Sequence, residues 1–544
     1  MKMNKRGFTL IELLAVIVIL AIIALIATPL ILNVIDDAKK GAFKNSAYGI
    51  IEAAELSYAL DMLNGDLEEI TITYDNYTEH NPSGKKLQYK GQQPKDGEIR
   101  INKDGKIAIA ISDGKYCARK GLNKSEVIIT EESTDECKIS ISAHPELDYG
   151  MIPIYWDKDN VVRKADERNV SVEHMWYDYD EQMWANAVLV KETGVKTRDY
   201  YKSAQLGTEI EEDDILAYLV WIPRYKYKLF NVDSEEIEEE QIKIIFEDKN
   251  TPKSNGDENG EWLTHPAFTF GDDETNGFWV GKFETTGTID KPTVKPTTEE
   301  QNVSSLRYQR ISEQFATAKL FNSRTEELDY GLTPNYDAHM MKNIEWGAVA
   351  YLSQSQYGKE GEIWINPSRD YYTGCAGSRE NSSEKDGCPN YYYTVNGVNA
   401  STTGNVYGIY DMNGGAIEYV MGGMYSSRSH RRVEPSSTNF SEEELTLDHE
   451  DFIGLKYIDL YDYGESDKVH DYSRRHLGDA TGETNDWYND RHSFVHHGNF
   501  WFNRGGDYGD IHNSGIFAFT CNGGHGDSNH TFRLVITGYI YSNN

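Results

Sequence analysis

The chain has 544 residues, 26% of them charged, and 88 Asp and Glu residues outnumber 54 Lys and Arg residues. The resulting formal net charge of −34 repels phosphate backbones, and no concentrated basic patch offsets it, so nucleic acid is not an expected partner. The length favours several domains over one. The 37 tyrosines suit a recognition surface, although β-rich domains also use this residue.

The N-terminus carries a basic head, MKMNKRG, followed by a long apolar run. Residues 13–32 form a stretch about as long as a helix needs to span a bilayer. No small-residue cleavage site of an ordinary signal peptide follows it. Apolar residues recur instead at spacings of three and four, which predicts one continuous helix over 8–60. Glu12 is the lone ionisable group in the apolar stretch, and a carboxylate there is costly unless it has a partner.

The segment KRGFTLIELLAVIVILAIIA resembles the class III signal of type IV prepilins and pseudopilins. The resemblance implies that a prepilin peptidase removes the leader 1–7 by cutting between Gly7 and Phe8, with N-methylation of the new Phe8 amine. It also implies that Glu12 neutralises the N-terminal amine of a neighbouring pilin subunit, because this pairing removes the cost of two isolated charges in lipid. The chain is then expected to cross the cytoplasmic membrane once before assembly and to end in an extracellular filament at the cell surface.

Residues 61–145 alternate apolar and polar positions in short runs separated by turn signals. The stretch GEIRINKDGKIAIAIS, for example, alternates around an Asp104-Gly105 hairpin signal. This pattern predicts a small β head and resembles the sheet that packs on the helix of a pilin. Residues 146–205 are acidic and rich in Tyr and Trp, and we interpret them as a small β connector.

Four of the five cysteines fall into two local pairs. Cys117 and Cys137 lie in the predicted β head, and Cys375 and Cys388 lie farther along the chain. Neither pair has CxxC spacing or a nearby His, so zinc is not expected. Two disulfides in an exported protein fit better, and Cys521 is left over.

From about residue 206 to 544 several phrases occur in a fixed order: YLVWIPRYKYKLF, GFWVGKFETTG, NIEWGAVAYL, NVYGIYDMNGGAIEYVMG, RGGDYG and TFRLV. Together they resemble the formylglycine-generating-enzyme-like branch of the C-type lectin fold. The resemblance implies a mixed α/β, C-type-lectin-like domain over 206–544 that binds a ligand. The whole chain is therefore expected to be α+β, with a long helix, a small β-sheet head and this larger domain.

The enzymes of that branch use two cysteines shortly after an (R/K)GG motif. Aligning RGGDYGDIHNSG with that pattern places Asp510 and Gly515 where the thiols should be. Without thiolates there is no copper ligand and no nucleophile, so we expect no enzyme activity. Two alternatives stay open: a surface-displayed enzyme of the sulfatase-modifying type, and a purely structural pseudopilin of a secretion or DNA-uptake system.

The same resemblance implies a structural Ca²⁺ in the YDMxGxxxE segment. Carried over by position, Asp411 and Glu418 would supply carboxylates, and Gly414 and Ala416 would supply main-chain carbonyls. Such hard oxygen ligands suit calcium. The alternative is a buried acid held by backbone amides.

The C-terminal residues 484–544 contain no Lys, Glu, Gln or Met. One branch of the C-type lectin fold serves as the variable protein of diversity-generating retroelements, in which adenines of AAY-type codons are randomised. Randomisation of such codons cannot produce Lys, Glu, Gln, Met or Trp. The short segments RGG, GIF and FRLV between the polar residues resemble an unvaried scaffold. The resemblance therefore implies a diversified face that binds an external protein or carbohydrate, and an ordinary turn-rich surface is the alternative.

The predicted ligand contacts are the polar residues that interrupt those segments. The first group comprises Asp507, Tyr508, Asp510, His512, Asn513, Ser514, Thr520, Asn522, His525, Asp527, Asn529 and His530. The second group comprises Tyr488, His492, His496, His497, Asn499 and Asn503. Side chains of this kind hydrogen-bond and stack when a rigid scaffold displays them on loops.

Overall fold

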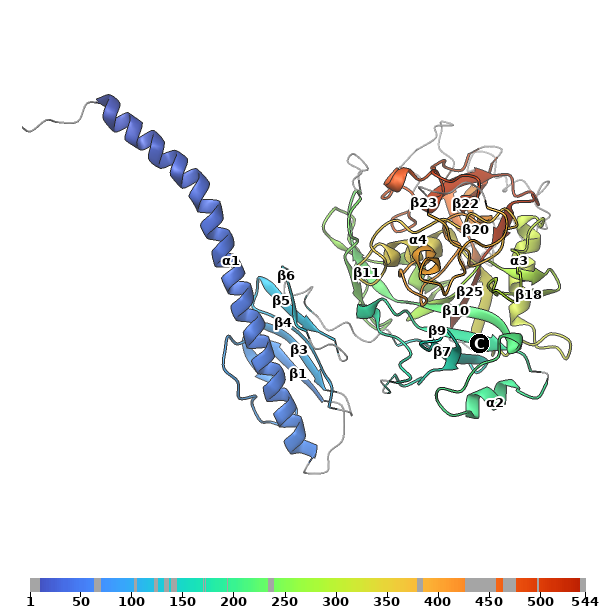
Figure 1. The fold of residues 1–544 in the computed structure, drawn as a ribbon, viewed down its shortest axis with the longest axis horizontal. Coiled ribbons are helices and arrows are strands. Elements are labelled where there is room, and N and C mark those ends of the chain that lie inside the picture. The colour runs from blue at the N-terminus through green and yellow to red at the C-terminus, as the bar shows by residue number, and fades with distance from the viewer. Residues whose placement is uncertain are drawn as a thin grey trace, which may run out of the picture. The chain divides into compact units, whose positions relative to one another are not determined.

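A computed structural model describes most of the chain. The chain divides into two compact units, unit 1 (1–139) and unit 2 (140–544) (Figure 1). Side chains of the first helix are described for residues 35–60 and 62. The described residues are 10–62, 70–101, 105–121, 126–131, 137, 144–169, 171, 173–192, 194–232, 239–378, 385–425, 456–462, 476–496 and 499–538.

Unit 1 is a long helix, α1 (Leu10–Met62), packed on an antiparallel sheet. The sheet has the order β2-β1-β3-β4-β5-β6. Its strands are β1 (Ile70–Asp75), β2 (Thr78–His80), β3 (Asp96–Ile101), β4 (Ile107–Ser112), β5 (Tyr116–Lys120) and β6 (Ile128–Glu131). Ala47, Ile50 and Ala54 of α1 are buried with Ile99 and Ile109 of the sheet. The predicted N-terminal helix followed by β structure is thus confirmed.

Within the described residues, no helix meets the length and apolar character that a membrane crossing requires. The predicted membrane segment 13–32 lies in the part of α1 whose side chains are not described.

Unit 2 is built around a seven-stranded antiparallel sheet of order β19-β25-β16-β10-β9-β7-β8. Its strands are β7 (Met151–Trp156), β8 (Val162–Lys164), β9 (Asn186–Val190), β10 (Ile215–Pro223), β16 (Gly277–Gly281), β19 (Tyr336–Met340) and β25 (Leu534–Gly538). Residues 146–205 are therefore no connector, because β7, β8 and β9 continue the sheet of β10. Fully buried Trp176, Trp184, Trp221, Trp279 and Trp346 belong to the core of this unit.

A second sheet carries the C-terminal segment. Its order is β21-β20-β22-β23, and β24 pairs with β20 in parallel. The strands are β20 (Ile417–Tyr425), β21 (Asp459–Asp462), β22 (Trp501–Gly505), β23 (Gly515–Asn522) and β24 (His530–Phe532). After β24 the chain enters the large sheet as β25, between β16 and β19. The short link from β24 to β25 therefore connects the two sheets.

Shorter elements cover these sheets. The helices are α2 (Arg198–Ser203), α3 (Ile311–Lys319) and α4 (Asn343–Ser353), with 3-10 turns η1 (Tyr179–Glu181), η2 (Glu212–Asp214), η3 (Pro266–Phe268), η4 (Leu320–Asn322), η6 (Gly397–Ala400) and η9 (Trp487–Asn489). The small strands are β11 (Tyr225–Lys228), β12 (Ile244–Phe246), β13 (Trp262–Thr264), β14 (Thr269–Phe270), β15 (Asp273–Glu274), β17 (Thr286–Thr288) and β18 (Lys291–Thr293).

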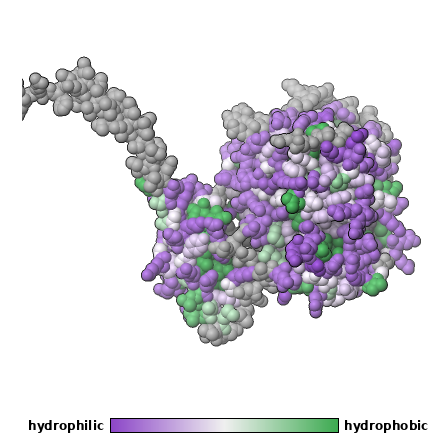
Figure 2. Space-filling model, viewed as in Figure 1, coloured by the Kyte–Doolittle hydropathy of each residue, from purple (hydrophilic) through white to green (hydrophobic). Residues whose placement is uncertain are grey.

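Both predicted disulfides form. The Cα atoms are 5.4 Å apart in Cys117–Cys137 and 5.2 Å apart in Cys375–Cys388. Cys521 is free. On the face that Figure 2 shows, unit 2 is mostly hydrophilic and its apolar residues form small separate spots, as the acidic composition leads us to expect.

Candidate ligand-binding face

Two loops of unit 2 carry nine of the twelve predicted contact residues of the first group. Loop 506–514 joins β22 to β23, and loop 523–529 joins β23 to β24. Gly505 and Gly506 open the first loop with φ of 81° and 70°, a left-handed conformation that favours glycine. Because β24 lies beside β20, the second loop crosses back toward the first. We call the two loops the candidate face.

Side-chain hydrogen bonds close the first loop on itself and link it to the second. Asp507 N donates to Asp510 Oδ2 at 3.1 Å, and Gly509 N donates to Asp507 Oδ1 at 2.8 Å. Asn529 Nδ2 donates to the other oxygen of Asp507 at 2.7 Å. The carboxylate of Asp507 therefore fixes the position of both loops.

Most first-group residues are open to solvent. The exposed ones are His512, Asn513, His525 and Asp527, and the half-buried ones are Asp507, Tyr508, Asp510, Thr520, Asn522 and Asn529. They comprise a tyrosine, carboxylates, histidines and amides, a composition that recognition surfaces use.

Three predicted contacts lie in the interior instead: Asn503, Ser514 and His530 are buried. His530 Nε2 lies 3.1 Å from Asn503 Nδ2, and its ring stacks on Tyr419 with centroids 4.6 Å apart. Burial lowers the pKa of His530 to about 4, so its ring is neutral at physiological pH. These side chains are buried beneath the surface of unit 2, so they are not available to contact a ligand.

The second group is only partly joined to this face. His492 Nδ1 lies 2.7 Å from Asp486 Oδ1, and Arg491 next to it pairs with Asp510 at 3.8 Å. The Tyr488 hydroxyl accepts a hydrogen bond from Gln354 Nε2 at 2.9 Å. His496 and Asn499 are half-buried, and His497 lies outside the described residues.

Sequence reasoning missed three residues beside the face: Arg307, Tyr308 and Tyr371. Tyr308 N donates to Asp527 O at 3.1 Å, so the segment before α3 runs along the second loop. The Tyr371 ring meets the Tyr508 ring edge-on, with centroids 5.0 Å apart. No periodic pattern marks these positions, and the abundance of tyrosine is the one signal that pointed to a recognition surface.

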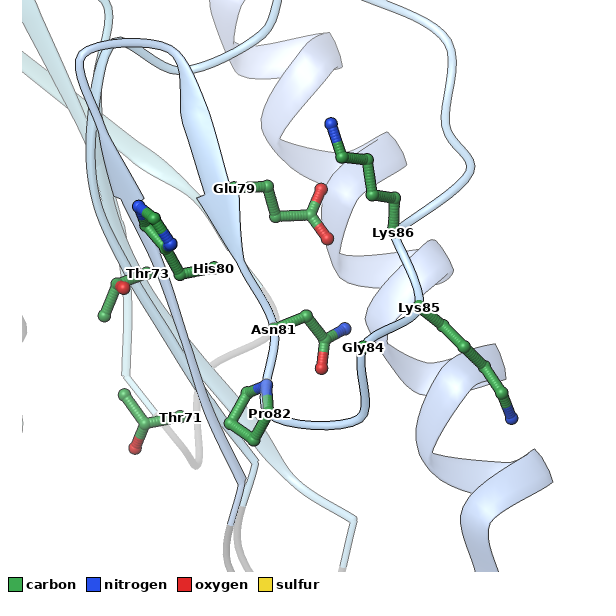
Figure 3. Close-up of a pocket in the computed structure, with 9 residues that line it drawn as sticks. All are labelled: Thr71, Thr73, Glu79, His80, Asn81, Pro82, Gly84, Lys85 and Lys86. Carbon is green, nitrogen blue, oxygen red and sulfur yellow. The ribbon is translucent and has the colours of Figure 1, made fainter.

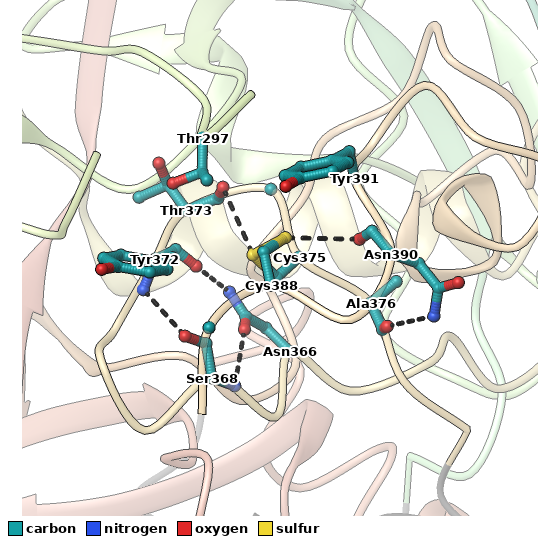
Figure 4. Close-up of a disulfide and its surroundings, with 12 residues drawn as sticks. Thr297, Asn366, Ser368, Tyr372, Thr373, Cys375, Ala376, Cys388, Asn390 and Tyr391 are labelled. Carbon is teal, nitrogen blue, oxygen red and sulfur yellow. Dashed lines mark hydrogen bonds between the residues drawn. A yellow bond between two sulfur atoms is a disulfide. The ribbon is translucent and has the colours of Figure 1, made fainter. Parts of the chain in front are cut away.

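The Cys375–Cys388 disulfide lies in the segment that follows Tyr371, and Figure 4 shows it near Tyr372 and Thr373. Asn366 Nδ2 donates to Tyr372 O at 2.8 Å, and Tyr372 N donates to Ser368 Oγ at 3.2 Å. Figure 4 shows these bonds beside the disulfide. These bonds fix the main chain next to Tyr371, whose own N donates to Ser368 O at 3.0 Å.

The residues predicted to hold calcium do not fit that ion. Both oxygens of Glu418 accept hydrogen bonds from Arg533, from Nε at 3.0 Å and from Nη2. Asp411 Oδ1 accepts from Asn366 Nδ2 at 2.8 Å and from Gly374 N at 2.9 Å. N–H donors thus surround both carboxylates. Gly414 and Ala416 were predicted to offer main-chain carbonyls only, and the described part of the chain holds no group of three His, Cys, Asp or Glu side chains placed to bind a metal ion.

The acids of this cluster are instead buried around one arginine. Burial and the neighbouring Asp411 and Glu418 raise the pKa of Glu284, which accepts from Ala416 N at 2.9 Å. Burial also raises the pKa values of Asp411 and Glu418, while Arg533 opposes the shift. Backbone amides donate to Asp411 and Glu284, as in the alternative to calcium, whereas an arginine side chain donates to Glu418.

No residue near the RGG motif supplies a reactive thiol. Asp510 and Gly515 occupy the two positions, and half-buried Cys521 lies with its Sγ 3.8 Å from Ser493 Oγ. Burial raises the pKa of Cys521, which makes its thiolate scarcer.

Unit 1 has a hollow of about 480 Å³ beside β2 (Figure 3). Its lining is Thr71, Thr73, Glu79, His80, Asn81, Pro82, Gly84, Lys85 and Lys86. Glu79 Oε1 accepts from Leu87 N at 2.9 Å. Figure 3 shows Glu79 and Lys86 on the loop side of β2 and His80 on its other side. The hollow is an open surface feature of mixed charge, and these described residues form no nucleophile–base pair.

Comparison with protein families places a prokaryotic N-terminal methylation motif at residues 2–28. The motif spans the predicted cleavage position at Gly7 and Phe8, which lies outside the described residues, and Glu12, whose side chain is not described. It supports a type IV pilin or pseudopilin N-terminus, and it implies a prepilin peptidase and other pilins as partners, with membrane insertion before filament assembly. A search of curated proteins found no match.

Proposed function

We propose that this chain is a minor type IV pilin or pseudopilin whose unit 2 binds an external ligand. In this proposal unit 2 has a C-type-lectin-like fold, and the candidate face makes the contacts. The observation that carries the proposal is the linkage of two polar loops by Asp507 and Asn529 at 2.7 Å, beside exposed aromatic and charged side chains. A methylation motif at one end and a rigidly held polar face near the other suit a filament-borne adhesin.

The experiment compares three strains: wild type, a deletion of 140–544, and an Asp507→Ala variant. The proposal expects filaments in all three strains, normal surface adhesion only in the wild type, and strongly reduced adhesion in Asp507→Ala. Undiminished adhesion of the deletion strain refutes ligand binding by unit 2. Loss of filaments in that strain favours instead a structural pseudopilin whose second unit binds other subunits.

We further propose that the face is diversified by a retroelement. The absence of Lys, Glu, Gln and Met from 484–544 supports this proposal, since AAY-type randomisation cannot produce those residues. Sequencing of the DNA downstream of the gene tests it. A near-copy of the codons for about 487–533 that differs mainly at adenines is the expected result. An invariant 3′ end without such a copy refutes diversification and leaves a dedicated binding face.

A further inference from the structure

Arg307 occupies a special position at the edge of the candidate face. Its guanidinium carbon lies 3.9 Å from the ring centroid of Tyr371 and 5.4 Å from that of Tyr308. Nε donates to Ser305 O at 3.4 Å, and Nη1 donates to Ser528 O in the second loop. Stacking and main-chain contacts therefore hold the guanidinium plane in one orientation.

This arginine lacks an acidic partner in a strongly acidic protein. Arg491 pairs with Asp510 and Arg533 pairs with Glu418, whereas no Asp or Glu oxygen of the described residues lies within 4.0 Å of the Arg307 nitrogens. The two N–H groups of Nη2 make no hydrogen bond to the described chain, and the side chain is half-buried. An oriented guanidinium with free N–H groups matches a planar carboxylate, which it binds through two parallel hydrogen bonds.

Two tyrosines, Tyr308 and Tyr371, lie against this guanidinium, and a third, Tyr508, packs on Tyr371. Tyr308 is 65% exposed, so its ring offers an open flat surface. Tyr371 lies beneath Arg307, and Tyr508 meets Tyr371 edge-on. Such a ring can pack against the apolar C–H face of a flat molecule while its hydroxyl keeps a polar partner. Asp527 and Asn529 next to Arg307 supply acceptors and donors for hydroxyl groups.

We propose that Arg307, Tyr308, Tyr371 and Tyr508 form a subsite for an acidic sugar residue with a single carboxylate. The inference rests on the proposed ligand-binding role of unit 2 and names the ligand class. The carboxylate pairs with Arg307, the sugar ring packs on Tyr308, and its hydroxyls meet Asp527 and Asn529. An acidic peptide suits the site less well, because further carboxylates would approach Asp507, Asp510 and Asp527. The same repulsion rejects sulfated polyanions.

The test uses the purified full chain in detergent on an array of uronic-acid and sialic-acid oligosaccharides, each beside its carboxyl-reduced counterpart. We expect binding to acidic members and roughly ten- to hundredfold weaker binding after carboxyl reduction, since one charged hydrogen-bond pair is lost. Arg307→Gln should lose the same factor, and Arg307→Lys most of it, because an ammonium cannot form the planar pair. Arg310→Gln is the matched control: it removes the same charge from an exposed arginine of the same segment and should bind like wild type.

Several outcomes would overturn the inference. They are absence of binding to every acidic glycan, equal binding to the carboxyl-reduced forms, wild-type binding by Arg307→Gln, and binding of a Glu-rich peptide without binding of the glycans. Tryptophan fluorescence of each variant verifies that it is folded. If the deletion of 140–544 abolishes adhesion while the array stays negative, the acidic-sugar subsite is refuted and the proposed function stands. If adhesion survives the deletion, the proposed function itself fails.

Discussion

The buried carboxyl group of Glu483 should make unit 2 less stable as the pH rises. Its Oε2 accepts from Gly478 N at 2.6 Å and from Tyr351 OH at 2.8 Å, and Tyr227 OH lies 3.1 Å from Oε1. The side chain is 1% exposed, and burial raises its pKa to about 7 from an ordinary value of 4.5. The folded state thus holds this proton at a pH where the unfolded chain has released it.

The sign and size follow from proton linkage. A raised pKa in the folded state gives a stability contribution that is complete below about pH 4.5 and is lost as the pH rises through about 7. The difference of about 2.5 units corresponds to about 3 kcal/mol at high pH. About 2 kcal/mol of this loss falls between about pH 5.5 and about pH 8.

The Glu483→Gln variant isolates this contribution, because an amide resembles the protonated acid in shape and does not ionise. All 10 tryptophans lie in unit 2, so tryptophan fluorescence during urea unfolding monitors this unit. Wild type should lose about 2 kcal/mol more than Glu483→Gln between about pH 5.5 and about pH 8. All other titrating groups are shared and cancel in the comparison. Identical pH dependence of the two proteins would refute the reasoning.

Glu345→Gln is a control in which the pKa of the replaced carboxyl group is lowered by folding instead of raised. Glu345 is also buried, and burial by itself raises the pKa of its carboxyl group. His339, whose Nε2 lies 3.1 Å from the carboxylate, outweighs this effect, so the pKa of Glu345 is lowered. The ionised carboxylate therefore stabilises the fold at every pH above its ordinary pKa. This stabilisation is lost as the pH falls through the lowered pKa. The variant should be destabilised at both pH values, by about 3 kcal/mol for a broken buried pair.

Three further outcomes can be measured with the same fluorescence signal. Lys282→Met should cost about 3 kcal/mol, because the buried ammonium donates to three oxygens at 2.6–2.9 Å that would lose their partner; an unchanged urea midpoint would contradict this. Replacement of both Cys375 and Cys388 by Ser should cost about 3 kcal/mol, since the bridge closes a loop with a sequence separation of 13, and a reductant should mimic it in wild type only. His512→Ser and His525→Ser should each change stability by less than about 0.5 kcal/mol, because both side chains are exposed; a larger loss would give them a structural role.

The features that sequence predicted correctly depend on local patterns. Apolar spacing of three and four predicts α1, and the alternation around Asp104-Gly105 predicts the antiparallel β3–β4 pair, in which Ile101 faces Ile107. Cysteines 20 and 13 positions apart predict the two disulfides. In each case the information lies within a few turns of chain, where period and distance alone decide the structure.

The features that sequence missed depend on contacts between distant segments. Arg533 donates to both carboxylate oxygens of Glu418, which was predicted to bind calcium, although the two residues are 115 positions apart. Arg307 reaches Ser528 across 221 positions. His530 looks like a surface residue by composition, yet Asn503, Asn522 and Tyr419 surround it in the interior. Polarity predicts exposure only where a polar group has no internal partner.

Main-chain hydrogen bonds would allow a diversified face, as proposed above, to change its side chains and keep its shape. Tyr508 N donates to Gly415 O at 3.0 Å, Ile417 N to Asn529 O at 2.9 Å, and Arg491 N to Asn513 O at 2.8 Å. None of these bonds depends on the side chain that the loop residue carries. Asp507 is the exception, since its carboxylate holds Gly509 and Asn529. If the face is diversified as proposed, it would be expected to keep Asp507 more often than His512 or His525. The proposed carboxylate subsite at Arg307 lies outside the two loops and would then stay constant.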